Sequence, residues 1–219
     1  MRTPQKNRIV ARTLVAAALV AVFPSGLSAQ FAPDTPRLIS PRGPGGLGVY
    51  FVQPDVFPGD DVGVLATWAM PGLPPSLRLR GGVGTGAEDT QAIFGGIDVQ
   101  TALIRARDGQ PLDVDWQAGA GFSVGDHAVV TIPVGVTGGV SWSSGSVWMS
   151  PYTTAGVALD LHFGGNFEGD EFEIDPALDV GLDLSLDSAR NVVLRAAASL
   201  GDRQAFAVGL AVGGGARTR

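Results

Sequence analysis

The sequence predicts an all-β protein, an antiparallel up-and-down β-barrel of about ten strands, with eight strands as the alternative. From Leu112 to Val124, and again from Ala128 to Trp142, large apolar residues occupy nearly every second position, with small or polar residues between them. A period of two indicates a β-strand with two different faces. The 32 glycines among 219 residues follow no collagen period and are typical of turns and closely packed strands.

Ten segments combine this alternation with turn residues at their ends. They are residues 47–53, 62–70, 77–85, 91–106, 112–124, 127–142, 147–163, 172–187, 191–200 and 204–213. None of the connections is long enough for a crossover helix, so sequential strands must pair antiparallel. Pro133, Pro151 and Pro176 fall inside long segments. Each removes a ladder hydrogen bond, and we expect bulges or bends there.

The N-terminus has the layout of a secretory signal peptide over residues 1–29. Arg2, Lys6 and Arg8 precede an apolar run from Leu14 to Phe23, and small residues follow. We place the cleavage after residue 29. A transmembrane anchor is the alternative, but the run has about half of the roughly 20 residues that a membrane-spanning helix needs.

The rest of the chain divides into three parts. Residues 30–46 are rich in Pro and Gly and have no period, which predicts a flexible leader. Residues 47–214 carry the barrel, and residues 215–219 form a short tail. The chain has no cysteine, so its stability must come from packing or from a membrane. The formal net charge of −6 argues against nucleic acid as a partner.

The direction of the apolar face distinguishes a soluble barrel from a membrane barrel. Several segments run to 13 residues or more, against a usual strand length of about 5–6 residues. Their apolar positions hold large residues, whereas the other positions hold Gly, Ala, Ser and Thr with scattered charges, which suits a crowded interior. The outer surface of a soluble barrel would carry many lysines, and Lys6 is the only one in the chain. The pattern favours an apolar face turned outward against lipid.

Aromatic residues of the apolar face fall near the ends of the segments. Trp68, Trp116 and Trp142 lie toward the end that holds the two termini, and Phe122, Phe163, Phe172 and Phe206 lie toward the other end. Two such belts suit the two membrane–water interfaces. Trp148 falls on the opposite face.

The opposite face predicts an acidic lumen. The inward-facing charged residues are Arg78, Arg80, Asp98, Asp113, Asp115, Asp160, His162, Glu173, Asp175, Asp179, Asp183 and Arg195. About eight strands leave a lumen that side chains just fill, and open channels appear at 16–18 strands. We therefore expect side chains to plug the lumen, with a narrow cation-preferring path as the alternative.

With a signal peptide, dyad-repeat strands and aromatic belts, residues 47–213 resemble the small bacterial outer-membrane β-barrel proteins, which have eight to twelve strands and include porin-like members. The resemblance implies a place in the outer membrane, contact with its lipid and insertion by the barrel-assembly machinery. It leaves the oligomeric state open. In one respect the chain departs from the group, because it ends "LAVGGGARTR" with no aromatic residue after Phe206.

The expected role is structural or that of a narrow pore, with no enzymatic activity, no cofactor and no metal. A soluble exported barrel that binds a small apolar ligand is the first alternative, and it requires the inverted facing. An outer-membrane hydrolase is the second. For that role Asp160 could orient His162, and Asp126 and His127 form a further pair. The acidic loop over residues 164–175 could hold Ca²⁺, but a solvated loop is the simpler interpretation.

Overall fold

The computed structural model describes residues 35–54, 62–70, 76–85, 91–107, 110–125, 128–163, 172–201 and 204–213. Its regular structure is entirely β. The strands are β1 (Gly46–Pro54), β2 (Val62–Ala69), β3 (Ser76–Thr85), β4 (Gln91–Ile104), β5 (Leu112–Val124), β6 (Ala128–Val140), β7 (Trp142–Ser144), β8 (Val147–Phe163), β9 (Phe172–Ser185), β10 (Val192–Leu200) and β11 (Ala205–Gly213). Each predicted segment coincides with a strand to within a few residues. No helix among these residues is long and apolar enough to cross a membrane.

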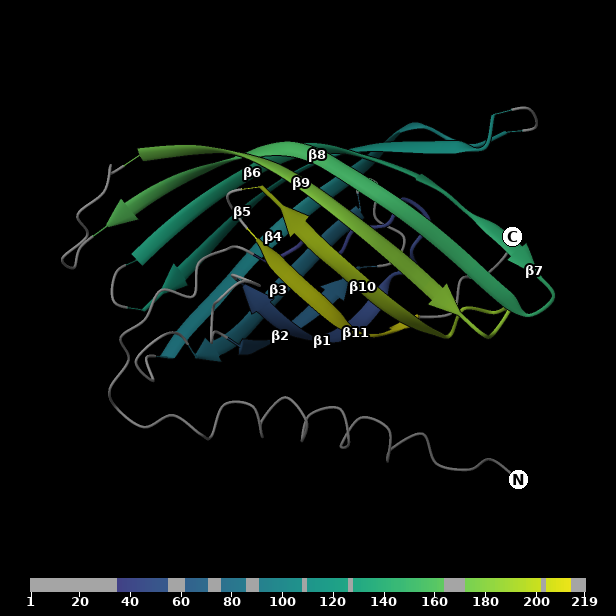
Figure 1. The fold of residues 1–219 in the computed structure, drawn as a ribbon, viewed down its shortest axis with the longest axis horizontal. Coiled ribbons are helices and arrows are strands. Elements are labelled where there is room, and N and C mark those ends of the chain that lie inside the picture. Colours follow the sequence, from purple (N-terminus) through teal and green to yellow (C-terminus); the bar gives the residue numbers. More distant parts are fainter. Residues whose placement is uncertain are drawn as a thin grey trace, which may run out of the picture.

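The strands form a closed antiparallel barrel (Figure 1). Successive strands pair with each other, and β1 pairs with β11 to join the two ends of the chain. Both β6 and β7 pair with β8, and only Ser141 separates them, so together they act as one strand. The eleven segments therefore make ten barrel strands, which confirms the predicted up-and-down architecture.

The antiparallel order gives the barrel two distinct ends. At one end β1 begins at Gly46 beside the last residue of β11, Gly213, and we call this the terminal end. The connections β2–β3, β4–β5, β7–β8 and β9–β10 lie at the same end. The other five connections lie at the opposite end, which we call the loop end.

The ladders pass the three prolines without a change of register, so the expectation of bulges there was wrong. Pro151 pairs with Leu182, and Pro176 pairs with Val157, in one continuous register. Beside Pro133 the β5–β6 ladder keeps its register on both sides of a short gap, because the missing N–H removes only a bond. The one register shift between described strands lies in β4, between residues 102 and 104.

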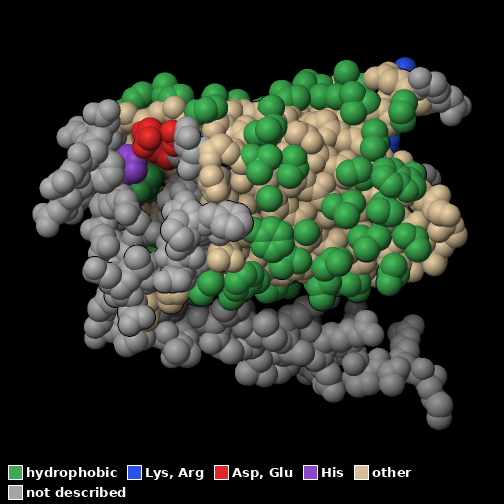
Figure 2. Space-filling view, viewed as in Figure 1, with side chains coloured by type: hydrophobic (Ala, Val, Ile, Leu, Met, Phe, Trp, Pro, Cys, Tyr) green, Lys and Arg blue, Asp and Glu red, His purple; other side chains and the backbone are tan. Residues whose placement is uncertain are grey.

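Large apolar side chains cover the outer wall (Figure 2), and polar side chains face inward. Val134, Val157 and Leu210 are about half exposed in the middle of their strands. In the view of Figure 2 the acidic side chains gather near one end, and most of the wall is apolar or uncharged. The two faces therefore have the composition and the direction that the alternation predicted.

Trp148 is the exception noted in the sequence, and it does face inward. It is 2% exposed and packs with Val193 and Ala211 near the terminal end. The guanidinium of Arg190 lies 4.7 Å from the centroid of its ring, a cation–π distance. Asp187 orders the adjacent β9–β10 turn by accepting a hydrogen bond from the backbone N–H of Ala189, and this bond holds the pKa of Asp187 below its ordinary value.

Glycines on the inner wall make room for two buried tyrosines. Gly209 lies opposite Tyr50 in the β1–β11 ladder, and Gly181 lies opposite Tyr152 in the β8–β9 ladder. A Cβ at Gly209 would lie 2.6 Å from Tyr50 Cα and would press on the carbonyl oxygen of Val49. The missing side chains let each ring lie flat across its neighbouring strand.

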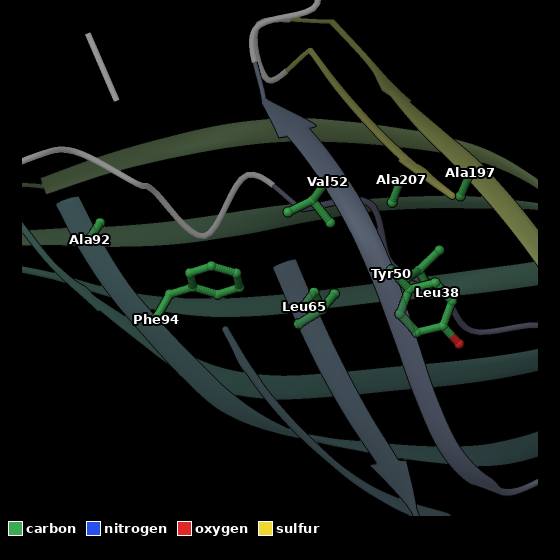
Figure 3. Close-up of a cluster of buried hydrophobic side chains, with 8 residues drawn as sticks. All are labelled: Leu38, Tyr50, Val52, Leu65, Ala92, Phe94, Ala197 and Ala207. Carbon is green, nitrogen blue, oxygen red and sulfur yellow. The ribbon is translucent and has the colours of Figure 1, made fainter. Parts of the chain in front are cut away.

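Residues 35–45, which we call the lumen segment, lie inside the barrel without forming a strand. The sequence predicted a flexible leader through residue 46. Instead, Thr35, Leu38, Ile39 and Ser40 are buried, none of them more than 6% exposed. Leu38 packs beside Tyr50 in a buried apolar cluster on the inner wall (Figure 3). Composition identified the lack of regular structure but not the burial, because the partners of the segment lie on distant strands.

We predict that Gly209→Ala lowers the free energy of unfolding by about 1–3 kcal/mol, because the new methyl group must displace Tyr50 or the β1 backbone. Gly138→Ala is the matched control, since its Cβ would meet only Leu112 Cδ1 at 3.9 Å. Urea unfolding followed by tryptophan fluorescence measures both variants. Equal stability of the two would contradict this account of the glycines.

Candidate functional site in the barrel lumen

A buried ion pair forms the centre of the lumen network. Arg195 on β10 donates to both carboxylate oxygens of Asp183 on β9, at 2.6 Å each. The two side chains are 2% and 0% exposed, and their backbones are direct neighbours in the β9–β10 ladder. A two-pronged guanidinium–carboxylate contact of this kind is among the strongest polar interactions in proteins.

The same arginine also holds the lumen segment. Its Nη1 donates to the carbonyl oxygen of Leu38 at 2.9 Å and lies 3.5 Å from the hydroxyl of Tyr50. Arg78 on β3 also donates to this carbonyl oxygen. Two positive groups from β3 and β10 therefore converge on one backbone oxygen of the lumen segment.

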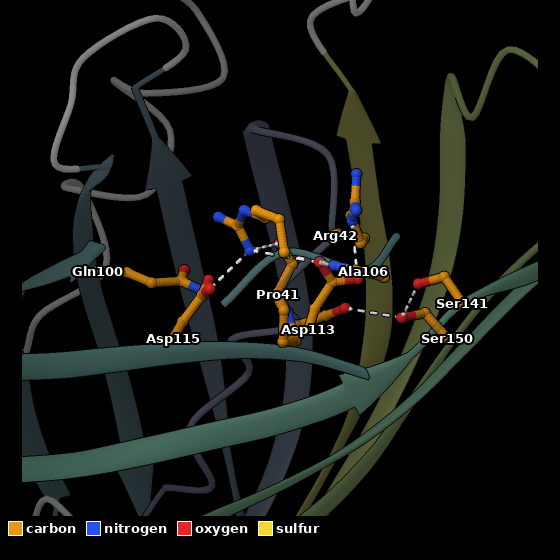
Figure 4. Close-up of polar contacts among 10 residues, drawn as sticks. Pro41, Arg42, Gln100, Ala106, Asp113, Asp115, Ser141 and Ser150 are labelled. Atoms are coloured by element: carbon orange, nitrogen blue, oxygen red, sulfur yellow. Dashed lines mark hydrogen bonds and ion pairs between the residues drawn. The ribbon is translucent and has the colours of Figure 1, made fainter. Parts of the chain in front are cut away.

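A second cluster lies at the terminal end (Figure 4). Asp113 accepts a hydrogen bond from Arg42 Nε of the lumen segment at 2.8 Å and from the backbone N–H of Ala106 at 3.0 Å. Asp115 accepts from Arg105 Nη1 at 2.6 Å and from Gln100 Nε2 at 2.5 Å. Two buried aspartates of β5 are thus satisfied by groups from β4, from the β4–β5 connection and from the lumen segment.

The lumen segment also makes contacts with β8 and β9. The backbone N–H of Arg37 donates to Asp179 Oδ2 at 3.1 Å, and Ser199 donates to the other oxygen of that carboxylate at 2.6 Å. The hydroxyls of Ser40 and Ser150 lie 3.2 Å apart, and Ser150 also contacts Ser141. The segment is therefore held along its length by single polar contacts to the wall.

Arg80 and Asp98 form a further pair on the inner wall. The Arg80 Nε atom lies 3.5 Å from Asp98 Oδ2, and both side chains are about 10% exposed. The guanidinium lies across two glycines of neighbouring strands. A Cβ at Gly96 would lie 2.9 Å from Arg80 Nε, and one at Gly121 would lie 3.1 Å from Arg80 Nη2.

Toward the loop end, Asp160 and His162, considered as a pair from the sequence, each contact a side chain of a neighbouring strand. Asp160 accepts a hydrogen bond from Thr131 at 2.5 Å. His162 Nε2 lies 3.8 Å from Glu173 Oε2 on β9. Asp160 and His162 share the inner face of β8, and His162 lies beside Glu173 of the adjacent strand β9. Asp126 and His127 lie outside the described residues.

The structure places the charged residues predicted for the lumen in three groups. The six aspartates at positions 98, 113, 115, 160, 179 and 183 are buried, together with Arg195. Arg78, Arg80, His162 and Asp175 are partly exposed. Glu173 has a side chain that is 54% exposed.

The aromatic residues predicted for the two belts all point outward. Trp68, Trp142, Phe122, Phe163 and Phe172 are each about half exposed. Trp116 and Phe206 are partly exposed. By register the tryptophans lie toward the terminal end and the phenylalanines toward the loop end.

Sequence reasoning missed the partners that the lumen segment supplies, Arg37 and Arg42. The available signal was charge: residues 35–45 contain these two arginines and no acidic residue, in front of a barrel with an acidic inner face. Arg105 was also missed, because it lies just beyond β4 in the connection to β5. Tyr50 and Tyr152 were not recognised as inward-facing.

Within the described part of the chain, no group of three or more His, Cys, Asp or Glu side chains is arranged to hold a metal ion. Most of the acidic loop considered for Ca²⁺, residues 164–171, lies outside the described residues.

No protein-family model matches the chain, and no curated protein matches it. Its class therefore follows from its own geometry. It is a closed ten-stranded antiparallel β-barrel with an apolar outer wall, a charged inner wall and an N-terminal segment inside the lumen.

We predict that Arg195→Leu lowers the free energy of unfolding by about 3–5 kcal/mol, because it leaves Asp183 buried without its ion partner. The double variant Arg195→Leu/Asp183→Leu should recover most of that loss, since no unpaired buried charge remains. Urea unfolding of the parent, the single variant and the double variant checks both statements. A double variant no more stable than the single one would show that the unpaired carboxylate of Asp183 does not cause the loss.

Proposed function

We propose that this protein is a bacterial outer-membrane β-barrel with a structural role, and that the lumen segment keeps its lumen closed. The observation that carries the proposal is the direction of the two faces. Large apolar side chains form the outer wall, while ion pairs and hydrogen bonds fill the inside. A membrane barrel needs this distribution, and a water-soluble barrel has the reverse.

Closure of the sheet supports the same assignment. The β1–β11 ladder joins the first and last strands, and the β6–β8 ladder completes the ring. A closed ladder leaves no free edge, so backbone N–H and C=O groups are satisfied within the sheet and the wall can contact lipid. The outward aromatic residues near both ends would then lie at the two membrane–water interfaces.

The soluble alternative depends on an interior lined by large apolar residues. The interior instead holds Asp183, Arg195 and five other ion-paired or hydrogen-bonded aspartates. Its apolar cluster around Tyr50 and Val52 is small and includes Leu38 of the lumen segment. For the hydrolase alternative, Asp160 accepts a hydrogen bond from Thr131 and His162 lies beside Glu173, while Asp126 and His127 lie outside the described residues. Among the described contacts, none favours either alternative.

Membrane fractionation combined with gel heat-modifiability tests the proposal directly. The protein should partition with outer membranes, require detergent for extraction and migrate differently on gels before and after boiling. Recovery of the folded protein in a detergent-free periplasmic extract would overturn the proposal.

We predict that Val134→Arg lowers the free energy of unfolding in lipid vesicles by about 2–4 kcal/mol, because Val134 lies on the outer wall in the middle of β6. Leu186→Arg is the matched control. Leu186 is 72% exposed just beyond the end of β9, where an arginine costs about 0–1 kcal/mol. On a water-exposed wall both substitutions would lie within about 0.5 kcal/mol of the parent, and that result would count against the membrane assignment.

A further inference from the structure

We propose that the lumen segment, residues 35–45, is a plug that closes a pore selective for small hydrated cations. The inference rests on the proposed function, since a pore requires a membrane. It goes further in two ways. It assigns closure of the lumen to residues 35–45, and it names small hydrated cations as the solutes that would cross the open lumen.

The charge of the segment complements that of the wall. The segment carries two charged residues. Arg42 donates its guanidinium to Asp113 at 2.8 Å. Arg37 donates its backbone N–H to Asp179 and its guanidinium to the carbonyl oxygen of Val157 at 3.5 Å, which places this second positive charge on the same inner wall. The segment therefore occupies the acidic interior as a tethered cation. The same carboxylates would contact mobile cations if the segment left.

The wall that would remain is acidic. Its strands carry six buried aspartates, at positions 98, 113, 115, 160, 179 and 183. They carry three inward-facing arginines, Arg78, Arg80 and Arg195. Rings of acidic side chains favour cations over anions in pores. Arg195 pairs with Asp183, and Arg105 of the β4–β5 connection contacts Asp115, so the six aspartates outnumber the four arginines that remain beside them.

Some buried polar groups of the inner wall have no hydrogen-bond partner among the described residues. The Gln117 side chain is 2% exposed, and neither its amide nitrogen nor its oxygen has a hydrogen-bond partner among the described residues. The hydroxyl of Tyr152 is in the same situation. Leaving such groups buried and unsatisfied costs about 1–3 kcal/mol each, and water is the usual partner in their place.

The barrel does not depend on the segment for its hydrogen-bonded ring. The ladders run from β1 through β11 and close between β6 and β8 without any residue of 35–45. The segment is attached by the packing of Leu38 in the apolar cluster and by individual polar contacts to Asp179, Val157, Arg195, Arg78, Arg105, Ser150 and Asp113. Its release would therefore leave the hydrogen-bonded ring of strands closed.

The first test weakens the charge attraction in the full-length protein. Purified Arg37→Gln/Arg42→Gln is inserted into planar lipid bilayers in a KCl gradient, beside the parent and Arg107→Gln. Arg107 is an exposed arginine in the β4–β5 connection and serves as the matched control for charge. We expect the double variant to conduct several-fold more than both others, with a reversal potential that reports K⁺ over Cl⁻.

The second test fixes the segment to the wall. The chain has no cysteine, and the hydroxyls of Ser40 and Ser150 lie 3.2 Å apart. Ser40→Cys/Ser150→Cys, added to the double variant, should therefore form a single disulfide between the segment and β8. We expect conductance to be lost in the oxidised protein and to return on reduction. Ser40→Cys alone, treated identically, should not change with the redox state.

The outcomes separate this inference from the proposed function. Failure of the heat-modifiable parent to insert into bilayers would overturn both. Insertion of Arg37→Gln/Arg42→Gln at parental conductance, or conductance unaffected by the disulfide, would overturn the plug alone. Selectivity for Cl⁻ would overturn the assignment to cations.

Discussion

The structure depends on the hydrogen-bonded ring that the β1–β11 and β6–β8 ladders complete. An open meander would have two edge strands with unpaired backbone N–H and C=O groups. Lipid cannot form hydrogen bonds with these groups. Once the ring is closed, each strand has one face outside and one inside, and the alternation of residue types assigns chemistry to both. The apolar exterior and the charged interior are therefore consequences of one closure.

Ten strands also determine how the interior must be filled. A barrel of about eight strands is filled by its own side chains, and a wider one leaves space. Here the inner wall carries many small residues, and the space is taken by Tyr50, Tyr152, the Arg195–Asp183 pair and the lumen segment. The segment contributes a carbonyl oxygen to two guanidiniums and a guanidinium to Asp113. The segment therefore supplies hydrogen-bond partners that the side chains of the strands do not supply.

The sequence was sufficient for the strands, their order and their faces, because each follows from the local period of two and from short turns. The β4 register shift near residue 102 and the uninterrupted register past Pro151 were not predictable, since both depend on how neighbouring strands fit together. The inward aspartates followed from alternation, but their partners did not. Arg42 lies 71 residues from Asp113 in the chain, and only the closed barrel brings the two together.

The position of the lumen segment ahead of β1 has a consequence for biogenesis. The last strand, β11, must emerge before the seam with β1 can form, so the segment is synthesised well before there is an enclosure to hold it. The segment must therefore bind to the inner face of the sheet before the barrel closes, or enter the lumen through one end of the closed barrel. Early capture would make Leu38 and its neighbours a template around which the late strands gather.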